Sequence, residues 1–453
     1  MKSLIKKSIF IFLLIFLIPS FCSCSFFDSI GDVFSKINDN ALGLTSKAGI
    51  EETDPDKYIH LDESGFNYSQ YYENIVCRKS YDHLKDEGEK ELYNELLTSI
   101  YYVYPEAEAT YQYKTKQIVL DGIFLSEAQV RTAIKALTDD NPQIFWTSNT
   151  FGYLLSEDNN YTAIQLYSFY SPNEIKTRIA QLNKAVDDFF ARVPSGLSEY
   201  ELEKYVHDEI IDMCDYDKTV IESKGKESDY NIYNPYGVMV KNSAVCEGYS
   251  RTMQLLLNGL GVNCIGVMGG SHNELHMWNA VEIDGSWYYV DSTWDDVEKA
   301  FMRYNYFNIS TEQLEKDHDF SPLFTEMTDS EICGDKEISA SSMNIFIPKC
   351  NEVKYNYYYK ECPHFYSFDD YSDIEDAVLN AAENSKEYIH IYIDKSLGFD
   401  DTVDLLFYSD PYYFFGYIRE VNDRLSDYSI DDSNLSIYKN ENLSIVTIFL
   451  KYI

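Results

Sequence analysis

The sequence has little positive charge and no closely spaced cysteine pair, and each shortage excludes a class of protein. Its 37 lysines and arginines stand against 75 aspartates and glutamates, which gives a net charge of −38. A surface this negative repels phosphate backbones, so we expect no nucleic acid among the partners. No CxxC pair occurs in the chain. A zinc ribbon or a thioredoxin-type redox motif is therefore unsupported, and we expect no cofactor.

Long apolar runs are also missing, apart from ten residues near the N-terminus. The run from Ile9 to Ile18 follows three lysines and contains only aliphatic residues and phenylalanine. It is too short to span a bilayer as a helix, which takes about 20 residues, but it is typical of the apolar region of a secretory signal. No later stretch is long and apolar enough to predict a transmembrane helix.

The residues after this run resemble a bacterial lipoprotein signal, in which a cysteine behind a small residue is lipidated and becomes the new N-terminus. Ser23-Cys24 fits that pattern. The resemblance implies a signal peptide over 1–23, a lipid on Cys24 and a location at the extracellular face of the bacterial cell membrane. Removing 1–23 would change the net charge to −41, because three lysines and no acid are lost. An ordinary cleaved signal with two incidental cysteines stays open as the alternative.

Composition and periodicity divide the remaining chain. We expect a polar tether over 24–56, an N-terminal α+β module over 57–195, a domain that carries the chemistry over 196–334, and a C-terminal α/β domain over 335–453. Helices are predicted over 88–103, after Ser126 and Ser198 (each opening a capping box), over 374–382 and over 412–425. Strands are predicted over 354–359, 389–393 and 443–450.

Seven cysteines follow Cys24, so at least one thiol must be unpaired. Cys350 and Cys362 bracket a tyrosine-rich stretch and could form a local disulfide. Cys246 precedes a run of apolar residues at helical spacing, which places it in the first turn of a mostly buried helix. The helix dipole and the unpaired N–H groups at that end favour a thiolate, although a cysteine in this position is often only a core residue.

A predicted hairpin brings a base and a carboxylate together. Asp284-Gly285 is a favoured two-residue turn between two strand-like segments. With that turn, Trp278 faces Asp291, and His276 lies two positions further along the same strand. Side chains alternate with period two, so His276 and Asp291 share one face of the sheet and lie diagonally within reach of each other. Cys246, His276 and Asp291 thus have the residue types of a nucleophile, a base and an orienting carboxylate.

Three ordered stretches resemble the bacterial transglutaminase-like superfamily. They are Val245-Cys246-Glu247-Gly248-Tyr249, His276-Met277-Trp278-Asn279 and Trp287-Tyr288-Tyr289-Val290-Asp291-Ser292-Thr293-Trp294. The resemblance covers about 200–320 and implies an α+β fold with a papain-like core, a cysteine-bearing helix packed on an antiparallel sheet, flanked by an N-terminal α/β module and a C-terminal α/β domain. It implies that Cys246, His276 and Asp291 form a catalytic triad and that the reaction passes through an acyl-thioester intermediate. Met277 departs from the family, where alanine is more usual, and this affects packing.

The resemblance leaves the oxyanion-hole side chain open. Tyr236 and Asn242 precede the cysteine at a plausible distance. A metal site could instead be drawn from His272, Glu274 and His276, with Cys246 or Cys264, but residues two apart in a loop converge poorly, and we expect no metal.

The predicted function is thiol-dependent acyl transfer at the cell surface. The substrate would be a peptide or protein amide, including cell-wall peptide, and an amine or water would accept the acyl group. The alternative is a non-catalytic module that binds protein or cell-wall glycan with the same fold. The 41 tyrosines, which stack well on sugars, keep it open, although biased composition also explains them.

Overall fold

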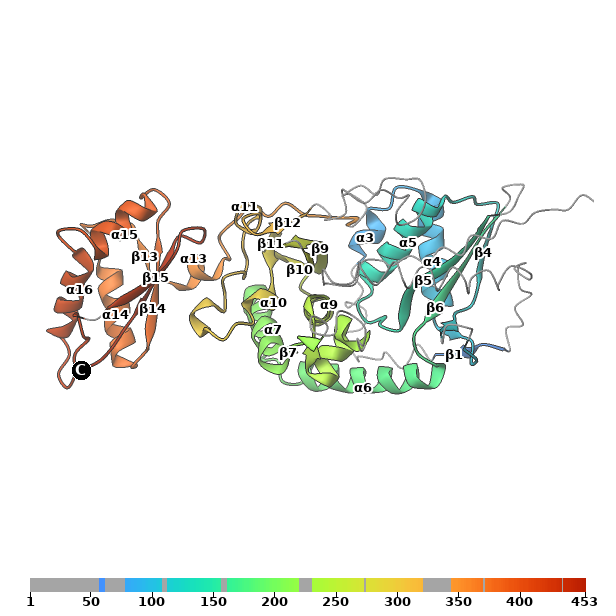
Figure 1. Cartoon of the computed structure of the whole chain (residues 1–453), viewed down its shortest axis with the longest axis horizontal. Helices are drawn as coiled ribbons and strands as arrows, with labels where there is room; N and C mark the ends of the chain where they lie inside the picture. The colour runs from blue at the N-terminus through green and yellow to red at the C-terminus, as the bar shows by residue number, and fades with distance from the viewer. Residues whose placement is uncertain are drawn as a thin grey trace, which may run out of the picture. The chain divides into compact units, whose positions relative to one another are not determined.

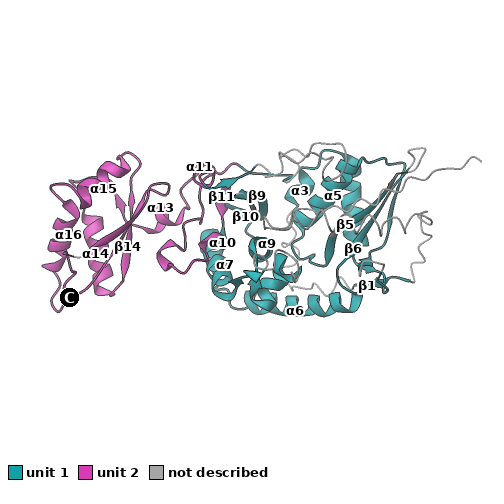
Figure 2. Ribbon diagram, viewed as in Figure 1, with its two compact units in different colours: residues 1–285, 291–293, 317–348 teal, residues 286–290, 294–316, 349–453 magenta. Residues whose placement is uncertain are grey.

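The computed structural model describes residues 57–61, 78–107, 112–155, 161–219, 230–272, 274–320, 344–369, 371–433 and 435–453. The predicted signal peptide, the tether and Cys24 lie outside these residues. The chain divides into two compact units, one of residues 1–285, 291–293 and 317–348 and one of residues 286–290, 294–316 and 349–453 (Figure 2). Among the described residues, no helix is both long enough and apolar enough to cross a membrane.

The first part of unit 1 is an antiparallel sheet packed with helices (Figure 1). The strands β3 and β4 both pair with β6, and β5 also pairs with β6. The elements are β1 Ile59–His60, α3 Lys79–Asp82, α4 Glu87–Ser99, β2 Tyr102–Val103, β3 Tyr113–Lys114, β4 Ile118–Asp121, α5 Glu127–Asp140, β5 Thr147–Leu155, β6 Tyr161–Ser168 and α6 Pro172–Phe190.

Serine capping boxes start α5, α6 and α7 (Glu199–Met213) in this unit, two of them at the serines that the sequence predicts. Ser126 and Ser198 each accept a backbone N–H from the third helical residue, whose side chain returns to the cap. Ser171 starts α6 in the same way. The predicted helix over 88–103 ends earlier, at Ser99, because residues 102–103 leave the helix and pair as a strand with β1.

The second part of unit 1 carries helix α9 on a sheet in which β9 lies between β10 and β12. The pairs β9–β10 and β9–β12 are antiparallel. The elements are α7 Glu199–Met213, β7 Asp215–Tyr216, η5 Tyr230–Tyr233, η6 Gly237–Lys241, β8 Ser243–Ala244, α9 Cys246–Gly259, β9 Cys264–Ser271, β10 Glu274–Ile283 and β12 His318–Asp319. Mixed helices and antiparallel strands confirm the α+β class.

The predicted hairpin turn is present after β10. Asp284 and Gly285 both have positive φ values, 49° and 77°, as a two-residue hairpin turn of the favoured type requires. The residue-by-residue register of the return strand stays a prediction.

Unit 2 is built on the sheet β13-β14-β16-β15, in which only the β13–β14 pair is parallel. Ile389, Ile391 and Ile393 alternate along β14 and point into the core formed with the helices. The elements are β11 Ser286–Val290, η7 Ala300–Met302, α11 Thr311–Leu314, α13 Tyr357–Glu361, β13 His364–Phe365, α14 Ser372–Glu383, β14 Tyr388–Ile393, α15 Phe399–Phe407, α16 Tyr413–Asn422, β15 Ser436–Asn440 and β16 Ile445–Phe449. The short helix α10, Ser292–Asp295, follows Asp291 directly.

One local prediction in this region is wrong, and one possibility that the sequence leaves open is excluded. The stretch 354–359 is not a strand, because the Asn356 side chain accepts the N–H groups of Tyr358 and Tyr359 and so starts helix α13. Cys350 and Cys362 do not form a disulfide, and both are free thiols. Cys350 is fully buried and donates its backbone N–H to the Thr311 hydroxyl, whereas Cys362 is the C-cap residue of α13.

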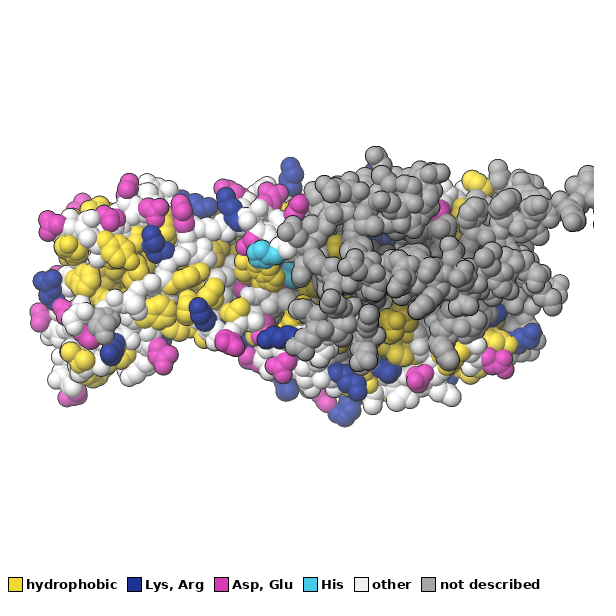
Figure 3. All heavy atoms as spheres, in the orientation of Figure 1, with side chains coloured by type: hydrophobic (Ala, Val, Ile, Leu, Met, Phe, Trp, Pro, Cys, Tyr) yellow, Lys and Arg dark blue, Asp and Glu magenta, His cyan; other side chains and the backbone are white. Residues whose placement is uncertain are grey.

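On the face shown in Figure 3, hydrophobic side chains of unit 2 lie among scattered acidic and basic ones. The described surface on this face carries both signs of charge, despite the net charge of −38. On the described part of this face, acidic and basic side chains are interspersed.

Candidate active site

Cys246 is the first residue of α9, as the sequence predicts, and it is buried with 1% of its surface exposed. Val245 stands at the N-cap position, and no side chain caps this end of the helix. Gly248 allows the first turn to lie directly on η5, since a Cβ at this position would come 2.4 Å from the Ile232 carbonyl oxygen. The nucleophile candidate is therefore held by backbone packing rather than by a side-chain cap.

Two hydrogen bonds tie α9 to strand β10 one turn after the cysteine. The Ser250 hydroxyl donates to the Trp278 carbonyl oxygen over 2.9 Å, and Asn279 Nδ2 donates to the Ser250 carbonyl oxygen over 3.0 Å. Both residues of β10 lie within three positions of His276. These bonds fix the position of α9 along β10 and so bring Cys246 to His276.

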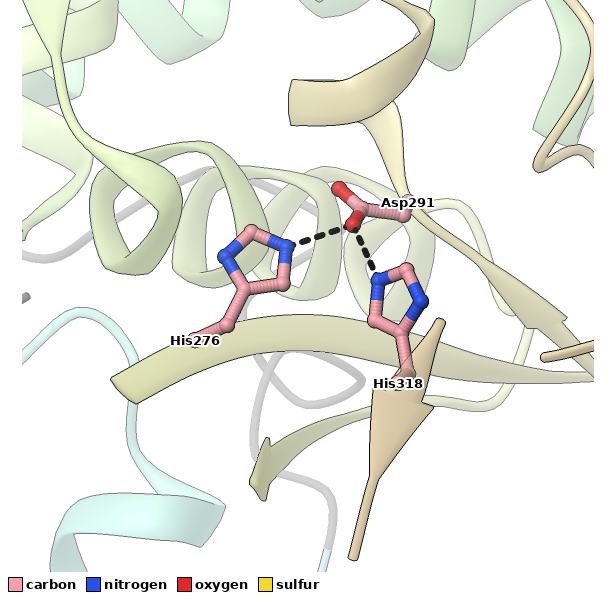
Figure 4. A group of neighbouring side chains, drawn as sticks. All are labelled: His276, Asp291 and His318. Atoms are coloured by element: carbon pink, nitrogen blue, oxygen red, sulfur yellow. Dashed lines mark hydrogen bonds and ion pairs between the residues drawn. The ribbon is translucent and has the colours of Figure 1, made fainter. Parts of the chain in front are cut away.

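His276 links the other two predicted site residues. Its Nε2–H donates to Asp291 Oδ2 over 2.5 Å (Figure 4). Its side chain also has a hydrogen bond with the Cys246 side chain. Since Nε2 faces the carboxylate, the cysteine is met by Nδ1. The structure thus brings Cys246, His276 and Asp291 together in that order.

The electrostatics favour a charged imidazole between two acceptors. Burial alone would lower the pKa of His276, but the charges and hydrogen bonds of Asp291 and Cys246 outweigh it and raise the pKa to about 10. Burial likewise opposes ionisation of Asp291, yet the two imidazoles beside it, His276 and His318, hold its pKa well below the usual range. The buried carboxylate is therefore an anion at neutral pH.

The Asp291 carboxylate is fixed through both oxygens. Its Oδ1 accepts the backbone N–H of Thr293 over 3.0 Å, while Oδ2 faces the imidazoles. The chain turns from a strand into α10 at this point, so the local turn supplies the N–H. A carboxylate held in this way orients the His276 ring and fixes which nitrogen carries the proton.

His318 is a neighbour that the sequence analysis does not single out. Its Nε2–H donates to Asp291 Oδ2 over 3.1 Å (Figure 4). Its Nδ1–H donates to Asp317 Oδ1 over 2.6 Å. It comes from β12, and the only sequence signal is a histidine flanked by aspartates 27 positions after Asp291. Its place in the site depends on the pairing of β12 with β9, which no local pattern predicts.

Gly269 lets the two histidine-bearing strands approach across β9. It is the β9 partner of His276 in the sheet register. A Cβ here would lie 2.3 Å from the Asp319 carbonyl oxygen and 2.5 Å from the Trp278 ring. The ring of Trp278 in turn lies 6.0 Å from that of His276, centroid to centroid. The absent side chain thus makes room for the indole that packs beside the imidazoles.

In the part of the chain that the structure describes, His272 and Cys264 join no group of metal-ligand atoms. His272 is exposed with a φ of 50°, and Cys264 Sγ accepts a hydrogen bond from Asn279 Nδ2. The described residues do gather ligand-type atoms of His276, Asp291 and His318 within 4.8 Å of one another. Both imidazoles already direct an N–H at the same carboxylate oxygen, and a metal would have to replace both hydrogen bonds. The geometry is that of a hydrogen-bonded chain.

Neither candidate for the oxyanion-hole side chain turns to the cysteine. The Tyr236 hydroxyl donates to Gln181 Oε1 over 2.5 Å, and Asn242 Nδ2 donates to the Met213 carbonyl oxygen over 2.8 Å. Both bonds hold the segment before α9 in place. These two side chains are thus structural in this conformation.

Comparison with known proteins identifies one domain of this chain. The sequence profile described as "Transglutaminase-like superfamily" matches residues 190–292, which include Cys246, His276 and Asp291. Residues 190–292 form a transglutaminase-like domain. The domain starts near the end of α6 and reaches the first residue of α10, so it contains α9, β9 and β10.

Two curated proteins are similar to part of this chain. The mouse (Mus musculus) kyphoscoliosis peptidase is 28% identical over 123 residues, 22% of this chain and 18% of the mouse protein. The human (Homo sapiens) kyphoscoliosis peptidase is 31% identical over 81 residues, 15% of this chain and 12% of the human protein. The chain thus spans less than a fifth of the length of these relatives.

A solved structure described as "Crystal structure of a TGase" also matches. It is 18% identical, covers 39% of this chain and 50% of its own, and has a TM-score of 0.23.

Proposed function

We propose that the protein is a thiol acyl-transfer enzyme that acts on peptide or protein amides through a thioester at Cys246. The observation that carries the proposal is the position of His276, buried between the Cys246 thiol and the Asp291 carboxylate. The transglutaminase-like domain that contains all three residues supports it.

Each residue has a role that follows from its contacts. The Cys246 thiolate attacks the amide carbonyl carbon, and the imidazolium of His276 gives its proton to the leaving amine as the carbon–nitrogen bond breaks. The acyl group then remains on sulfur as a thioester. A second amine or a water molecule attacks the thioester, His276 accepts its proton, and the thiolate leaves. Asp291 stabilises the imidazolium and holds the ring in orientation throughout.

The acceptor decides whether the activity is transamidation or hydrolysis. The mouse and human relatives carry the name peptidase, which favours water as the acceptor. We therefore propose peptide or protein amide hydrolysis, with cell-wall peptide among the substrates, as the first activity to test. Transamidation to an added primary amine is measured in the same assay, by the mass of the product.

Reactivity of the thiol tests the proposal without a known substrate. The protein without residues 1–24 is treated with iodoacetamide across a pH series, and the label on Cys246 is quantified by mass spectrometry. Because His276 stabilises the thiolate, we expect labelling well below the pKa of about 8.5 of a free cysteine, and slower labelling in a His276→Ala variant. Cys264, a buried thiol in the same chain, serves as the internal control.

Two outcomes would overturn the proposal. Cys246 could react no faster than an exposed thiol, or it could stay inert until the protein unfolds. Either result favours the non-catalytic binding module. That alternative predicts that a Cys246→Ala variant retains cell-wall or protein binding in full.

We also propose that a lipid on Cys24 anchors the protein to the extracellular face of the bacterial cell membrane. The signal-like segment and Ser23-Cys24 support this location. Labelled palmitate should enter the full-length protein but not a Cys24→Ala variant, and the variant should leave the membrane fraction. Equal labelling of the two proteins would contradict the anchor.

A further inference from the structure

The site continues beyond the three predicted residues. From the thiol outward, the hydrogen-bonded order is Cys246, His276, Asp291, His318 and Asp317. An acidic group and an imidazole alternate along this chain. All are buried except Asp317, whose side chain is 27% exposed.

We propose that His318 is a positioning residue of the acyl-transfer site. As an imidazolium, it shares the Asp291 carboxylate with His276 and so limits how tightly that carboxylate holds the catalytic imidazole. The proposal deepens the function proposed above and rests on it. The term positioning applies because His318 acts through Asp291.

The two hydrogen bonds of His318 show that it is charged. Its nitrogens each face a carboxylate oxygen, at 3.1 Å and 2.6 Å. A neutral imidazole has a single N–H, so it would turn a lone pair toward one of these oxygens. Only the doubly protonated ring satisfies both. Burial lowers the pKa of His318, but the bonds to Asp291 and Asp317 outweigh it and raise the pKa above its ordinary value.

Within the described residues, the titratable groups that act on His318 are Asp317, Asp291 and His276. Asp317 lies on the chain directly before β12, Asp291 follows β11 in sequence, and His276 lies on β10. Trp278 and Phe320 add uncharged aromatic surface, with the Trp278 ring 5.1 Å from that of His318. His276 is the one cation in this set, and its ring centroid lies 5.4 Å from that of His318.

Removing the charge of His318 should change the pKa of His276 in one definite direction. Asp291 would then interact with one imidazolium instead of two, and His276 would lose a repelling neighbour. Both changes raise the pKa of His276. For two charges 5.4 Å apart, with an effective dielectric constant between that of a protein surface and that of water, the shift is about 0.5 to 2 pH units.

The test replaces His318 by glutamine, which keeps one N–H donor but carries no charge. In His318→Gln, the midpoint of His276 titration, followed by NMR with ¹⁵N-labelled histidine, should rise by about 0.5 to 2 units. The midpoint of iodoacetamide labelling at Cys246 should rise as well, because the thiolate loses a nearby positive charge. A residue that only filled space would change the labelling rate and leave both midpoints in place.

The matched control is His390→Gln in unit 2. Burial lowers the pKa of His390 to about 4, so this buried histidine is neutral at pH 7, and its Nδ1 bonds to the Thr447 hydroxyl. Replacing it removes a buried imidazole without removing a charge, and both midpoints should stay where they are in the parent protein.

Two further measurements guard against a variant that fails to fold. In the unaltered protein at pH 7, the ¹⁵N spectrum should show His318 with both ring nitrogens protonated. Asp317→Asn, at a partly exposed position, should shift both midpoints in the same direction as His318→Gln, because His318 then loses its proton more easily.

The outcomes separate the two proposals. If Cys246 in the parent protein reacts as slowly as an exposed thiol, the proposed function fails, and the role of His318 fails with it. If Cys246 reacts quickly and depends on His276, but His318→Gln leaves both midpoints unchanged, the role of His318 alone is overturned. A singly protonated His318 at pH 7 in the parent protein would overturn it as well.

Discussion

Glu247, the residue after the nucleophile candidate, forms a buried ion pair within α9 with Arg251, and Arg251 also links α9 to α5. Glu247 Oε1 accepts Arg251 Nε–H over 2.7 Å, and the two side chains are 9% and 15% exposed. Arg251 Nη1 also donates to the Thr138 carbonyl oxygen over 2.8 Å, at the end of α5. Arg251→Met should therefore leave a buried carboxylate without its cation and remove one link between α5 and α9.

The expected loss of stability is large for a single substitution. Removing one partner of a buried ion pair costs about 3–5 kcal/mol, because the remaining charge is uncompensated. Lys135 also lowers the pKa of Glu247, which places the expected loss near the lower end, at about 3 kcal/mol. Burial already raises the pKa of Glu247 against the effect of Arg251, and without Arg251 the pKa must rise further.

The loss of stability in Arg251→Met must also depend on pH, and the direction of that dependence follows from the pKa of Glu247. A carboxyl group whose folded pKa exceeds its unfolded value binds more protons in the folded state, so stability falls as the pH rises through that range. The difference between Arg251→Met and the parent protein should be small near pH 4.5 and should grow toward pH 8. Adding Glu247→Gln to Arg251→Met should recover more than half of the loss at pH 8.

Urea unfolding followed by circular dichroism at a series of pH values measures this. The control is Arg131→Met, which breaks an ion pair with Glu127 of the same i,i+4 spacing whose side chains are 30% and 31% exposed. That loss should not exceed about 1 kcal/mol. Equal losses in the two variants, or a loss in Arg251→Met that does not change with pH, would refute the argument from burial.

Three further predictions concern the packing and titration of the site. Gly248→Ala should destabilise the protein by about 1–3 kcal/mol in urea unfolding, because the added Cβ would clash with backbone atoms. Gly416→Ala, with open space around it, should instead stabilise helix α16 by about 0.5–1 kcal/mol. Gly266→Ala brings a Cβ 2.2 Å from Met277 Cε, so Met277→Ala should relieve most of its cost, and a double-mutant cycle in urea should be non-additive. The pKa of His276 is raised to about 10, so its contribution to stability is complete below pH 6.5 and is lost as the pH rises toward 10, and the His276→Gln variant should show a flatter unfolding free energy over that range.

The parts of the site set by local rules could be predicted from the sequence. The turn at Asp284-Gly285 and the period of two along a strand place His276 and Asp291 on one face, and the structure joins them by a hydrogen bond. Cys246 starts a helix because an apolar run at helical spacing begins there. Met277 was expected to affect packing, and it does so by occupying the space that Gly266 leaves open.

The parts set by distant pairing could not be predicted. His318 enters the site because β12 pairs with β9, and a two-residue strand has no periodicity to detect. The helix at Tyr357 begins because the Asn356 side chain caps it, and this outweighs the strand preference of four tyrosines in the stretch 355–359. In both cases a single side-chain or strand contact decides the structure against the average tendency of the segment.

The alternation of charge along the site explains how so many ionisable groups can be buried together. A buried carboxylate is costly unless a cation and hydrogen bonds accompany it, and Asp291 has an imidazolium on each side and a backbone N–H on its second oxygen. Removing either histidine leaves one cation for that carboxylate, whereas removing Asp291 leaves two buried cations facing each other. The loss of Asp291 should therefore harm folding more than the loss of His318. The stability of each variant must be measured before its reactivity is interpreted, because the arrangement that activates the thiol also holds this part of the protein together.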